Sequence, residues 1–471
     1  MTALAPSLRR YARVTTAVPG PRSIAITDRE KPYLAPGIQS ISTLAGIAVD
    51  RGEGARVIDA DGNVFLDFVA GICVSSLGHG HPALAEALQK QASRMTATRF
   101  ACEERAELLE RIGKEAGKIG SGKLRKTQLY SGGAEAVESA LRLARAFTKR
   151  YEVLSFWGGY HGKTGGVAGL MGSDWKKGLG PSTFVPGLHL APYPDPYRSP
   201  LDGGDRVEGA ALEKMSSRYL GFLRDKIRLE TDGQLAAIIV EPIQGTAGNV
   251  MPPSGFLRGV RELCTEIGAL FICDEMITGW ARTGKMFGQL HEPGLEADIF
   301  TFGKGVGNGF PVTGLVTTDE IADPKNNDPW GRPSFSSSSY GGSPLAAAAA
   351  NAVTRVVVDS RLDEHAAKVG AHMLAALHKL AARHEVIGEV RGRGLLVAIE
   401  LVADKKTRAP LAKAQCERLF RKCLERGLLV MAYGPRVRIN PPLVITEAEA
   451  DEGIAILDEA LTELANERPV A

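Results

Sequence analysis

The sequence contains little of what metal centres, disulfide scaffolds and nucleic-acid surfaces require. Its 471 residues include six cysteines, at positions 73, 102, 264, 273, 416 and 423, and no two of them form a Cys-x-x-Cys pair. Histidines are few, and His79, His81 and His161 lie in turn-like motifs, so we expect no zinc site. A net charge of +3 without a basic stripe argues against nucleic acid as a partner. We interpret the cysteines as reduced thiols of a cytoplasmic protein.

Long apolar stretches are also missing. No run reaches about 18 apolar residues, so we expect no membrane span. The first 23 residues contain four arginines (Arg9, Arg10, Arg13 and Arg22) and no acid, which resembles a transit peptide, but they lack the apolar region of a secretory signal. We interpret them as a flexible or dimer-contacting arm, with organelle targeting as a minor alternative.

The apolar residues form short runs, and the composition is that of a globular protein, with 44% hydrophobic and 24% charged residues. Strand-like runs alternate with helical or loop stretches, which predicts an α/β fold whose mostly parallel sheet is covered on both faces. These runs span residues 127–130, 153–156, 236–240, 270–273, 299–302 and 315–317. An alanine-rich helix is expected over 345–358, and a smaller α+β unit that ends with a helix near Thr446 follows it.

One of these runs leads directly to a lysine. Residues 298–304 are Asp-Ile-Phe-Thr-Phe-Gly-Lys, and a glycine-rich segment follows them. Glycines let a flat ligand come close, and desolvation lowers the pKa of an amine and frees its lone pair for attack on a carbonyl. Lys304 is therefore a candidate imine-forming amine, although the pattern taken alone still favours a structural lysine.

Two further segments could complete a cofactor site. Asp274 ends another apolar run, where open α/β sheets place their ligands, and could keep the pyridine nitrogen of pyridoxal phosphate protonated. Residues 131–136, Ser-Gly-Gly-Ala-Glu-Ala, follow a strand and open a helix, whose free N–H groups suit a phosphate. The alternatives are a turn aspartate and a plain glycine turn before a helix.

Together with other motifs, these segments resemble the class III (omega-type) aminotransferases of the pyridoxal phosphate fold-type I superfamily. The motifs keep the family's order over roughly residues 45–460: residues 56–63, 66–68 and 77–82, Tyr160-His161-Gly162-Lys163-Thr164, Glu241-Pro242-Ile243-Gln244-Gly245, and residues 274–284. The resemblance implies a large cofactor domain over residues 81–350, with a mostly parallel seven-stranded sheet. It implies a smaller α+β domain from an amino-terminal part, residues 1–80 including the arm, and from residues 351–471.

The resemblance also implies roles at the cofactor, pyridoxal 5′-phosphate. Lys304 would form the Schiff base and move the proton between the substrate and the cofactor. Asp274 would pair with the pyridinium nitrogen, and Tyr160 would stack on the ring. His161 and Glu241 belong to the same implied site.

The phosphate and the second subunit are covered by the same resemblance. Gly133 and Ala134 would donate backbone N–H groups to the phosphate. Ser339 stands where the family usually has a threonine that reaches the phosphate from the other subunit, which implies a homodimer with shared active sites.

The substrate side departs from the family pattern. Arg438 matches the arginine that binds a substrate carboxylate, although Arg436 and Arg438 could instead form the solvent face of an edge strand. Lys163 stands where members that use 4-aminobutyrate or ornithine usually have an arginine, or it is simply part of a polar loop. Thr246 replaces the glutamate that masks the arginine while an omega-amine is bound. Ile277 replaces a glutamine near the ring oxygen of the cofactor.

These features predict a ping-pong aminotransferase that moves an amino group from an amino acid or amine to a 2-oxo acid. A racemase, an epimerase or a decarboxylating transaminase on the same fold is the alternative, because the reactions differ only in where the proton is returned. Met276 and Trp280 lie beside Asp274 and could line an apolar pocket or pack in the core.

Overall fold

The computed structural model describes residues 10–172 and 185–467, which form two units. One unit combines Met1–Ala85 with Ser360–Ala471, and the other comprises Glu86–Asp359. Arg9, part of the predicted arm, lies outside the described residues. Among the described residues, no helix combines the length and the apolar character needed to cross a membrane.

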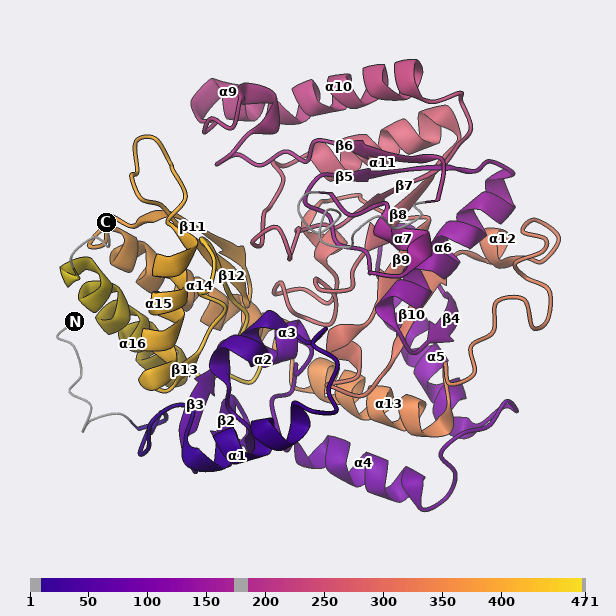
Figure 1. The fold of residues 1–471 in the computed structure, drawn as a ribbon. Coiled ribbons are helices and arrows are strands. Elements are labelled where there is room, and N and C mark those ends of the chain that lie inside the picture. Colours follow the sequence, from indigo (N-terminus) through magenta and orange to yellow (C-terminus); the bar gives the residue numbers. More distant parts are fainter. Residues whose placement is uncertain (1–9, 173–184, 468–471) are drawn as a thin grey trace. The chain divides into compact units, whose positions relative to one another are not determined.

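The unit Glu86–Asp359 is built on a seven-stranded sheet (Figure 1). Its strands, in spatial order, are β4 (Lys126–Tyr130), β10 (Thr313–Thr317), β9 (Ile299–Phe302), β8 (Leu270–Asp274), β7 (Leu235–Val240), β5 (Glu152–Phe156) and β6 (Leu188–Ala191). β10 is antiparallel to β4 and β9, and the other neighbouring pairs are parallel. The predicted α/β fold with a mostly parallel sheet is confirmed.

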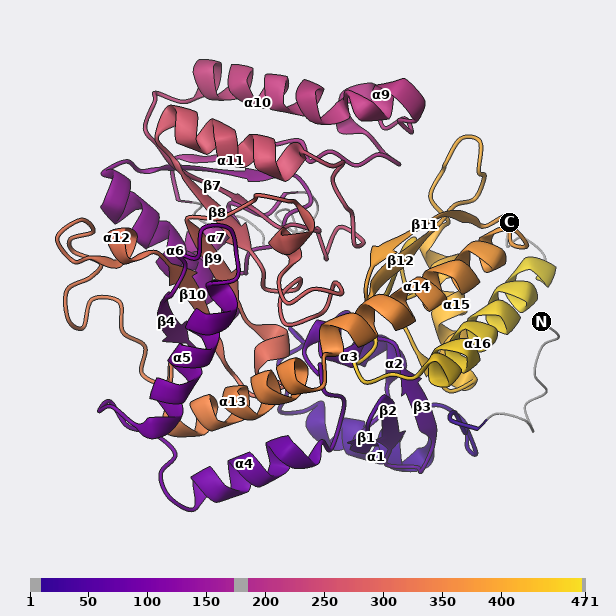
Figure 2. The ribbon, with the colours of Figure 1, turned by 180° about the vertical axis from the view of Figure 1, so that it is seen from behind.

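Every residue of strands β5, β7, β8 and β9 is buried, as expected for a sheet that is covered on both faces. The helices of this unit are α5 (Glu103–Ala116), α6 (Gly133–Thr148), α7 (Gly165–Ala168), α9 (Gly209–Glu213), α10 (Met215–Glu230), α11 (Phe256–Ile267), α12 (Asp319–Ala322) and α13 (Pro344–Asp359). In both views α10 lies along α11 (Figures 1 and 2), and α13 contacts α5. Three short 3-10 helices are η2 (Pro200–Asp202), η3 (Gly288–His291) and η4 (Lys304–Val306).

Helix α6 anchors the core of this unit. Its apolar face includes Val137, Leu141 and Leu143 and belongs to the same buried cluster as Ile272 of β8 and Ile299 of β9. The amino-terminal end of α6 lies next to the carboxyl end of β8, because Gly133 has Met276, two residues after that strand, beside it.

The other unit contains two small sheets. One has β1 (Val49–Glu53), β2 (Arg56–Asp59), β3 (Val64–Asp67) and β13 (Leu428–Leu429), and the other has β11 (Ile387–Arg393), β12 (Leu396–Leu401) and β14 (Arg436–Ile439). Its helices are α1 (Pro21–Glu30), α2 (Ser40–Ala45), α3 (Ala70–Cys73), α14 (Leu362–Ala381), α15 (Lys413–Glu425) and α16 (Glu447–Asn466), while α4 (Pro82–Ala92) spans the division in sequence. Thr446 caps α16 in a capping box with Glu449, as its sequence predicts.

The structure differs from two expectations. The sequence pattern missed β6, whose four residues include a histidine and give no strong alternation. The described part of the amino-terminal arm is not free, since the backbone N–H groups of Arg10 and Ala12 donate to the carboxylate of Glu452, and Arg13 bridges Val64. The flexible arm was therefore a wrong interpretation for these residues.

Candidate functional site

The predicted site residues of the large sheet meet at one edge. Asp274 is the last residue of β8, Lys304 follows β9 after one glycine, and Glu241 directly follows β7. These three strands are neighbours and run parallel, so their carboxyl ends lie at the same edge (Figure 1). Open α/β sheets bind ligands at this edge.

Asp274 is fully buried and fully hydrogen-bonded. Its Oδ2 lies 2.7 Å from Nδ1 of His161, and its Oδ1 accepts the hydroxyl of Thr301 at 2.7 Å. The backbone N–H of Met276 also donates to Oδ1, at 3.1 Å. The other ring nitrogen of His161, Nε2, lies 3.1 Å from Oγ of Ser155. A chain of four side chains from β5, β8, β9 and the loop after β5 therefore fixes this carboxylate.

The contacts with His161 decide the charge of Asp274. Burial alone would raise the pKa of Asp274, but the hydrogen bond and charge of His161, the hydroxyl of Thr301 and the charge of Lys304 outweigh it and lower that pKa. Burial alone would lower the pKa of His161, but Asp274 outweighs it and raises that pKa. These opposite shifts favour an imidazolium facing a carboxylate, and each of the two side chains is 1% exposed.

Lys304 opens the short helix η4 with an unusual backbone. Its φ is +44°, in the left-handed region that residues with a side chain rarely adopt. The side chain is half-buried, and its amine makes no hydrogen bond or ion pair with any described residue. A strained backbone and an amine without a partner are both typical of a functional lysine rather than a structural one.

Two glycines next to the site have no room for a side chain. A Cβ at Gly303 would collide with Sδ of Met276 and lie 2.9 Å from Cγ2 of Thr313. A Cβ at Gly133 would lie 3.3 Å from both Sδ and Cε of Met276. The side chain of Met276 therefore lies between the start of α6 and the residue before Lys304.

The start of α6 has the features of an anion site. The N–H groups of Gly133 and Ala134 lie in the first helical turn and have no acceptor within the helix. The side chain of Glu135 accepts the N–H groups of Ser131 and Gly132 at 3.1 and 3.3 Å and leaves the next two N–H groups open. Oγ of Ser131 is buried without a hydrogen-bond partner in the described part of the chain, as expected beside an anion that the protein binds.

The loop after β5 carries Tyr160 and His161 across this edge. A Cβ at Gly162 would lie 2.5 Å from Cβ of Ala134, so the loop contacts the start of α6 directly. The backbone N–H of Tyr160 donates to Oε1 of Glu241 at 2.8 Å. The ring of Tyr160 is half-buried.

The remaining predicted residues differ in exposure and in the unit to which they belong. Lys163 is exposed, Thr246 is half-buried, and Ser339 is exposed in the segment between α12 and α13. Arg438 belongs to the other unit, where it is half-buried in β14 and pairs with Ala398 of β12.

Trp280 packs in the core. It is 1% exposed, donates its indole N–H to Thr354, and packs against the rings of Phe287 and Phe302. The sequence left open whether Trp280 lines an apolar pocket or packs in the core, and the structure confirms core packing. Ile277 is also buried, against the backbone of Gly245.

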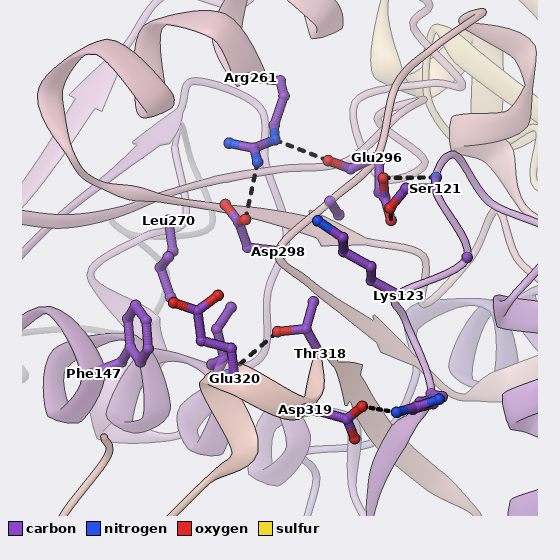
Figure 3. A pocket seen from close by; sticks show the side chains of 14 residues that line it. Ser121, Lys123, Phe147, Arg261, Leu270, Glu296, Asp298, Thr318, Asp319 and Glu320 are labelled. Atoms are coloured by element: carbon purple, nitrogen blue, oxygen red, sulfur yellow. Dashed lines mark hydrogen bonds and ion pairs between the residues drawn. The ribbon is translucent and has the colours of Figure 1, made fainter. Parts of the chain in front are cut away.

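A separate pocket lies at the opposite edge of the sheet (Figure 3). It has a volume of about 590 Å³ and is lined by Leu270, which begins β8, and by Asp298, which precedes β9. Several of its charged groups already pair with protein groups: Arg261 binds Asp298 at 3.0 Å, and Ser121 binds Glu296. It is therefore a poorer candidate than the edge that carries Lys304.

Comparisons with known proteins identify the family of this chain. The family model for class-III aminotransferases matches residues 39–461. This chain belongs to that family. Over 436 residues it is 34% identical to a 5-aminovalerate aminotransferase of Pseudomonas aeruginosa, covering 91% of this chain and 96% of the relative. It is also 31% identical over 460 residues to an alanine/serine racemase of Pyrococcus horikoshii, covering 96% of this chain and 93% of that protein.

Solved structures give the same result. An (S)-enantioselective omega-transaminase from Thermomicrobium roseum matches with a TM-score of 0.85 and 31% identity, over 96% of this chain and 100% of that one. The protein is thus an aminotransferase whose cofactor is pyridoxal 5′-phosphate. The residues present fit this group: a helix start with open N–H groups, a buried aspartate whose pKa is lowered, and a lysine amine without a hydrogen-bond partner among the described residues lie at one edge of the sheet.

The sequence alone missed two side chains of this cluster, which contact His161 and Asp274. Ser155 and Thr301 lie inside strands and read as ordinary strand residues. Thr301 is three residues before Lys304 and faces the end of the neighbouring strand, a register that only the pairing of β8 with β9 reveals. No signal in the sequence identifies Ser155.

Proposed function

We propose that Lys304 is the reactive amine with which the enzyme transfers an amino group from an amino acid or amine to a 2-oxo acid. The observation that carries this assignment is the unpaired, half-buried amine beside the buried Asp274–His161 ion pair. When bound, pyridoxal 5′-phosphate supplies an aldehyde for imine formation and a ring that accepts electrons. Lys304 Nζ would remove the proton from the α-carbon of the donor in the first half-reaction and would deliver a proton to the α-carbon of the acceptor in the second.

The other residues of the cluster hold the cofactor in this proposal. Asp274 pairs with the pyridine nitrogen, because a buried carboxylate kept ionised by His161 favours a protonated ring. Tyr160 stacks on the ring, and Gly133 and Ala134 donate their backbone N–H groups to the phosphate. The buried pairing of His161 makes it the residue that sets the charge of Asp274.

Arg438 is our proposed anchor for the substrate carboxylate. Its guanidinium is half-buried and makes no hydrogen bond or ion pair with the residues that the structure describes, although a buried or half-buried arginine normally has a partner. Thr246 carries no charge, so no glutamate at that position masks the arginine, and Arg438 stays available to an α-carboxylate in both half-reactions. Lys163 offers a point charge for a second, distal carboxylate.

We also propose a cytoplasmic homodimer in which Ser339 reaches the phosphate of the partner subunit. In support, Tyr340 is 70% exposed and Phe100 is 82% exposed, and such apolar surface is typical of an interface. The two segments are connected, since the N–H of Leu345 donates to the carbonyl of Thr96. All six cysteines are free thiols, which suits a reducing compartment.

The visible spectrum of the cofactor-loaded protein tests the reaction. Amines and amino acids are added one at a time, followed by pyruvate or 2-oxoglutarate. Loss of the visible band on adding a donor and its return on adding a 2-oxo acid is the expected result, and an α-amino acid should be the best donor. If the band changes without being lost and the amino acid is racemised, the racemase alternative is favoured, as the similarity to the Pyrococcus racemase would suggest.

A further inference from the structure

Glu241 makes contacts that its predicted place at the cofactor does not explain. It is 5% exposed and directly follows β7. Its Oε1 accepts the backbone N–H of Tyr160 at 2.8 Å, and its Oε2 accepts the backbone N–H of Gly245 at 3.2 Å. One carboxylate thus connects the loop after β5 with the loop after β7.

Both loops are held closely on either side of this contact. Nε2 of Gln244 donates to the carbonyl of Trp157 at 3.0 Å. The hydroxyl of Tyr193 donates to the carbonyl of Glu241 at 3.2 Å and approaches that of Pro242 at 3.3 Å. These contacts fix the position of Glu241, and its carboxylate in turn fixes the backbone N–H groups of Tyr160 and Gly245.

We propose that Glu241 is a positioning residue, whose two carboxylate oxygens fasten the Tyr160 loop to the Gly245 loop and so fix the ring of Tyr160 against the cofactor. The inference rests on the proposed function, because it takes the stacking role of Tyr160 from it. Glu241 acts through a backbone N–H and does not need to touch the cofactor or the substrate.

The contact requires an ionised carboxylate. Both oxygens face N–H donors, so a protonated Glu241 would point a hydroxyl hydrogen at one of them and lose that bond. The titratable groups that face Glu241, or act on it through His161, come from several elements: His161, Asp274, Tyr160, Tyr193 and Lys304. Burial raises the pKa of Glu241 to about 7, with Asp274 adding to this and His161 and the two N–H groups opposing it. The fastening should consequently weaken as the pH falls through neutrality.

Glu275 provides a matched control. It is also buried, and its two oxygens accept the backbone N–H groups of Gly288 at 2.7 Å and Gln289 at 2.8 Å. It therefore makes the same type of double contact, but to a loop that carries no proposed site residue.

The test compares the cofactor-loaded wild type with Glu241→Gln, Glu241→Asp and Glu275→Gln. Visible circular dichroism of the bound cofactor reports the ring environment, and fluorescence titration gives the cofactor affinity. In Glu241→Gln the amide NH₂ faces an N–H donor, so we expect a reduced dichroic band and about tenfold weaker cofactor binding, the loss typical of one charge-assisted hydrogen bond. The wild-type band should change around pH 7, and this change should be absent in Glu241→Gln. Glu241→Asp keeps the charge and should recover part of the band.

Two results would overturn the proposal: a wild-type band and affinity in Glu241→Gln, or the same loss in Glu275→Gln, which would indicate general destabilisation. If Glu241→Gln does not fold, a wild-type band that is constant between about pH 6 and 8 overturns it as well. Failure of the proposed function would look different, because turnover would be missing in the wild type while its cofactor band still depended on Glu241.

Discussion

The backbone of Lys304 offers a direct way to separate catalysis from stability. At φ +44° a side chain costs roughly 1–2 kcal/mol relative to an ordinary conformation, whereas glycine adopts this region freely. Lys304→Ala keeps a Cβ and therefore keeps the strain. Lys304→Gly removes it but has a more flexible unfolded chain, which costs about 0.5–1 kcal/mol. The cofactor-free Lys304→Gly variant should therefore be more stable than Lys304→Ala by about 0.75 kcal/mol, the difference between the two mid-range values.

Both variants lack the amine and should lose turnover by roughly a thousandfold or more. The assay is thermal unfolding of the two cofactor-free proteins under identical conditions, together with the rate of amino transfer. Comparing alanine with glycine cancels the effect of the lost lysine stem, so only the Cβ differs. If Lys304→Ala proves as stable as Lys304→Gly, the strain argument fails, and if either variant turns over repeatedly without an added amine, the assignment of Lys304 fails.

Three further predictions address the carboxylate anchor, the buried ion pair and the packing beside the lysine. Arg438→Gln should raise the KM for a 2-oxo acid by roughly ten- to a hundredfold, while an aldehyde acceptor without a carboxylate should be unaffected; steady-state kinetics would refute the anchor if both acceptors respond alike. His161 has a raised pKa in the folded protein, so its charged form stabilises the fold below about pH 6.5, and this stabilisation is lost as the pH rises through the folded pKa. Asp274 has a lowered pKa, so the stabilisation by its charged form persists until the pH falls below about 3.8. Thermal unfolding should thus show the largest advantage over His161→Gln between about pH 4 and 6.5, and an advantage that grows at higher pH would contradict the ion pair. Gly303→Ala should cost about 1–3 kcal/mol by collision with Met276, and adding Met276→Ala should recover part of the loss in a double-mutant cycle.

The sequence predicted most of the large sheet because its central strands are buried on both faces and therefore read as continuous apolar runs. Because these runs are continuous, the sequence also shows where they end: Asp274 stands at the end of one run, and Lys304 follows the end of another after one glycine. β6 was missed because a four-residue strand at the sheet edge with a histidine in it shows no such run.

The contacts of the site could not be predicted in the same way. His161 and Asp274 are 113 residues apart in sequence and meet only because β5 and β8 belong to one sheet with β7 between them. The hydrogen bonds of Glu241 to Tyr160 and Gly245 depend on how two loops approach each other, and hydrophobic periodicity carries no information on this. The positive φ of Lys304 also has no sequence signature, since lysine is not a residue that favours it.

The two buried carboxylates of this edge show how the site gives the same chemical group different pKa values. Asp274 and Glu241 end neighbouring strands and are both fully buried, so burial raises the pKa of each. Asp274 has an imidazole at 2.7 Å and the hydroxyl of Thr301 at 2.7 Å, and these lower its pKa below the usual value. Among the described residues, the carboxylate of Glu241 accepts hydrogen bonds from two backbone N–H groups, and burial raises its pKa to about 7. A carboxylate that must hold a proton on a ring nitrogen needs the first environment, because it has to stay ionised at every working pH. One that fastens a loop functions with the second, and the enzyme's response to pH near neutrality should therefore originate at Glu241 rather than at Asp274.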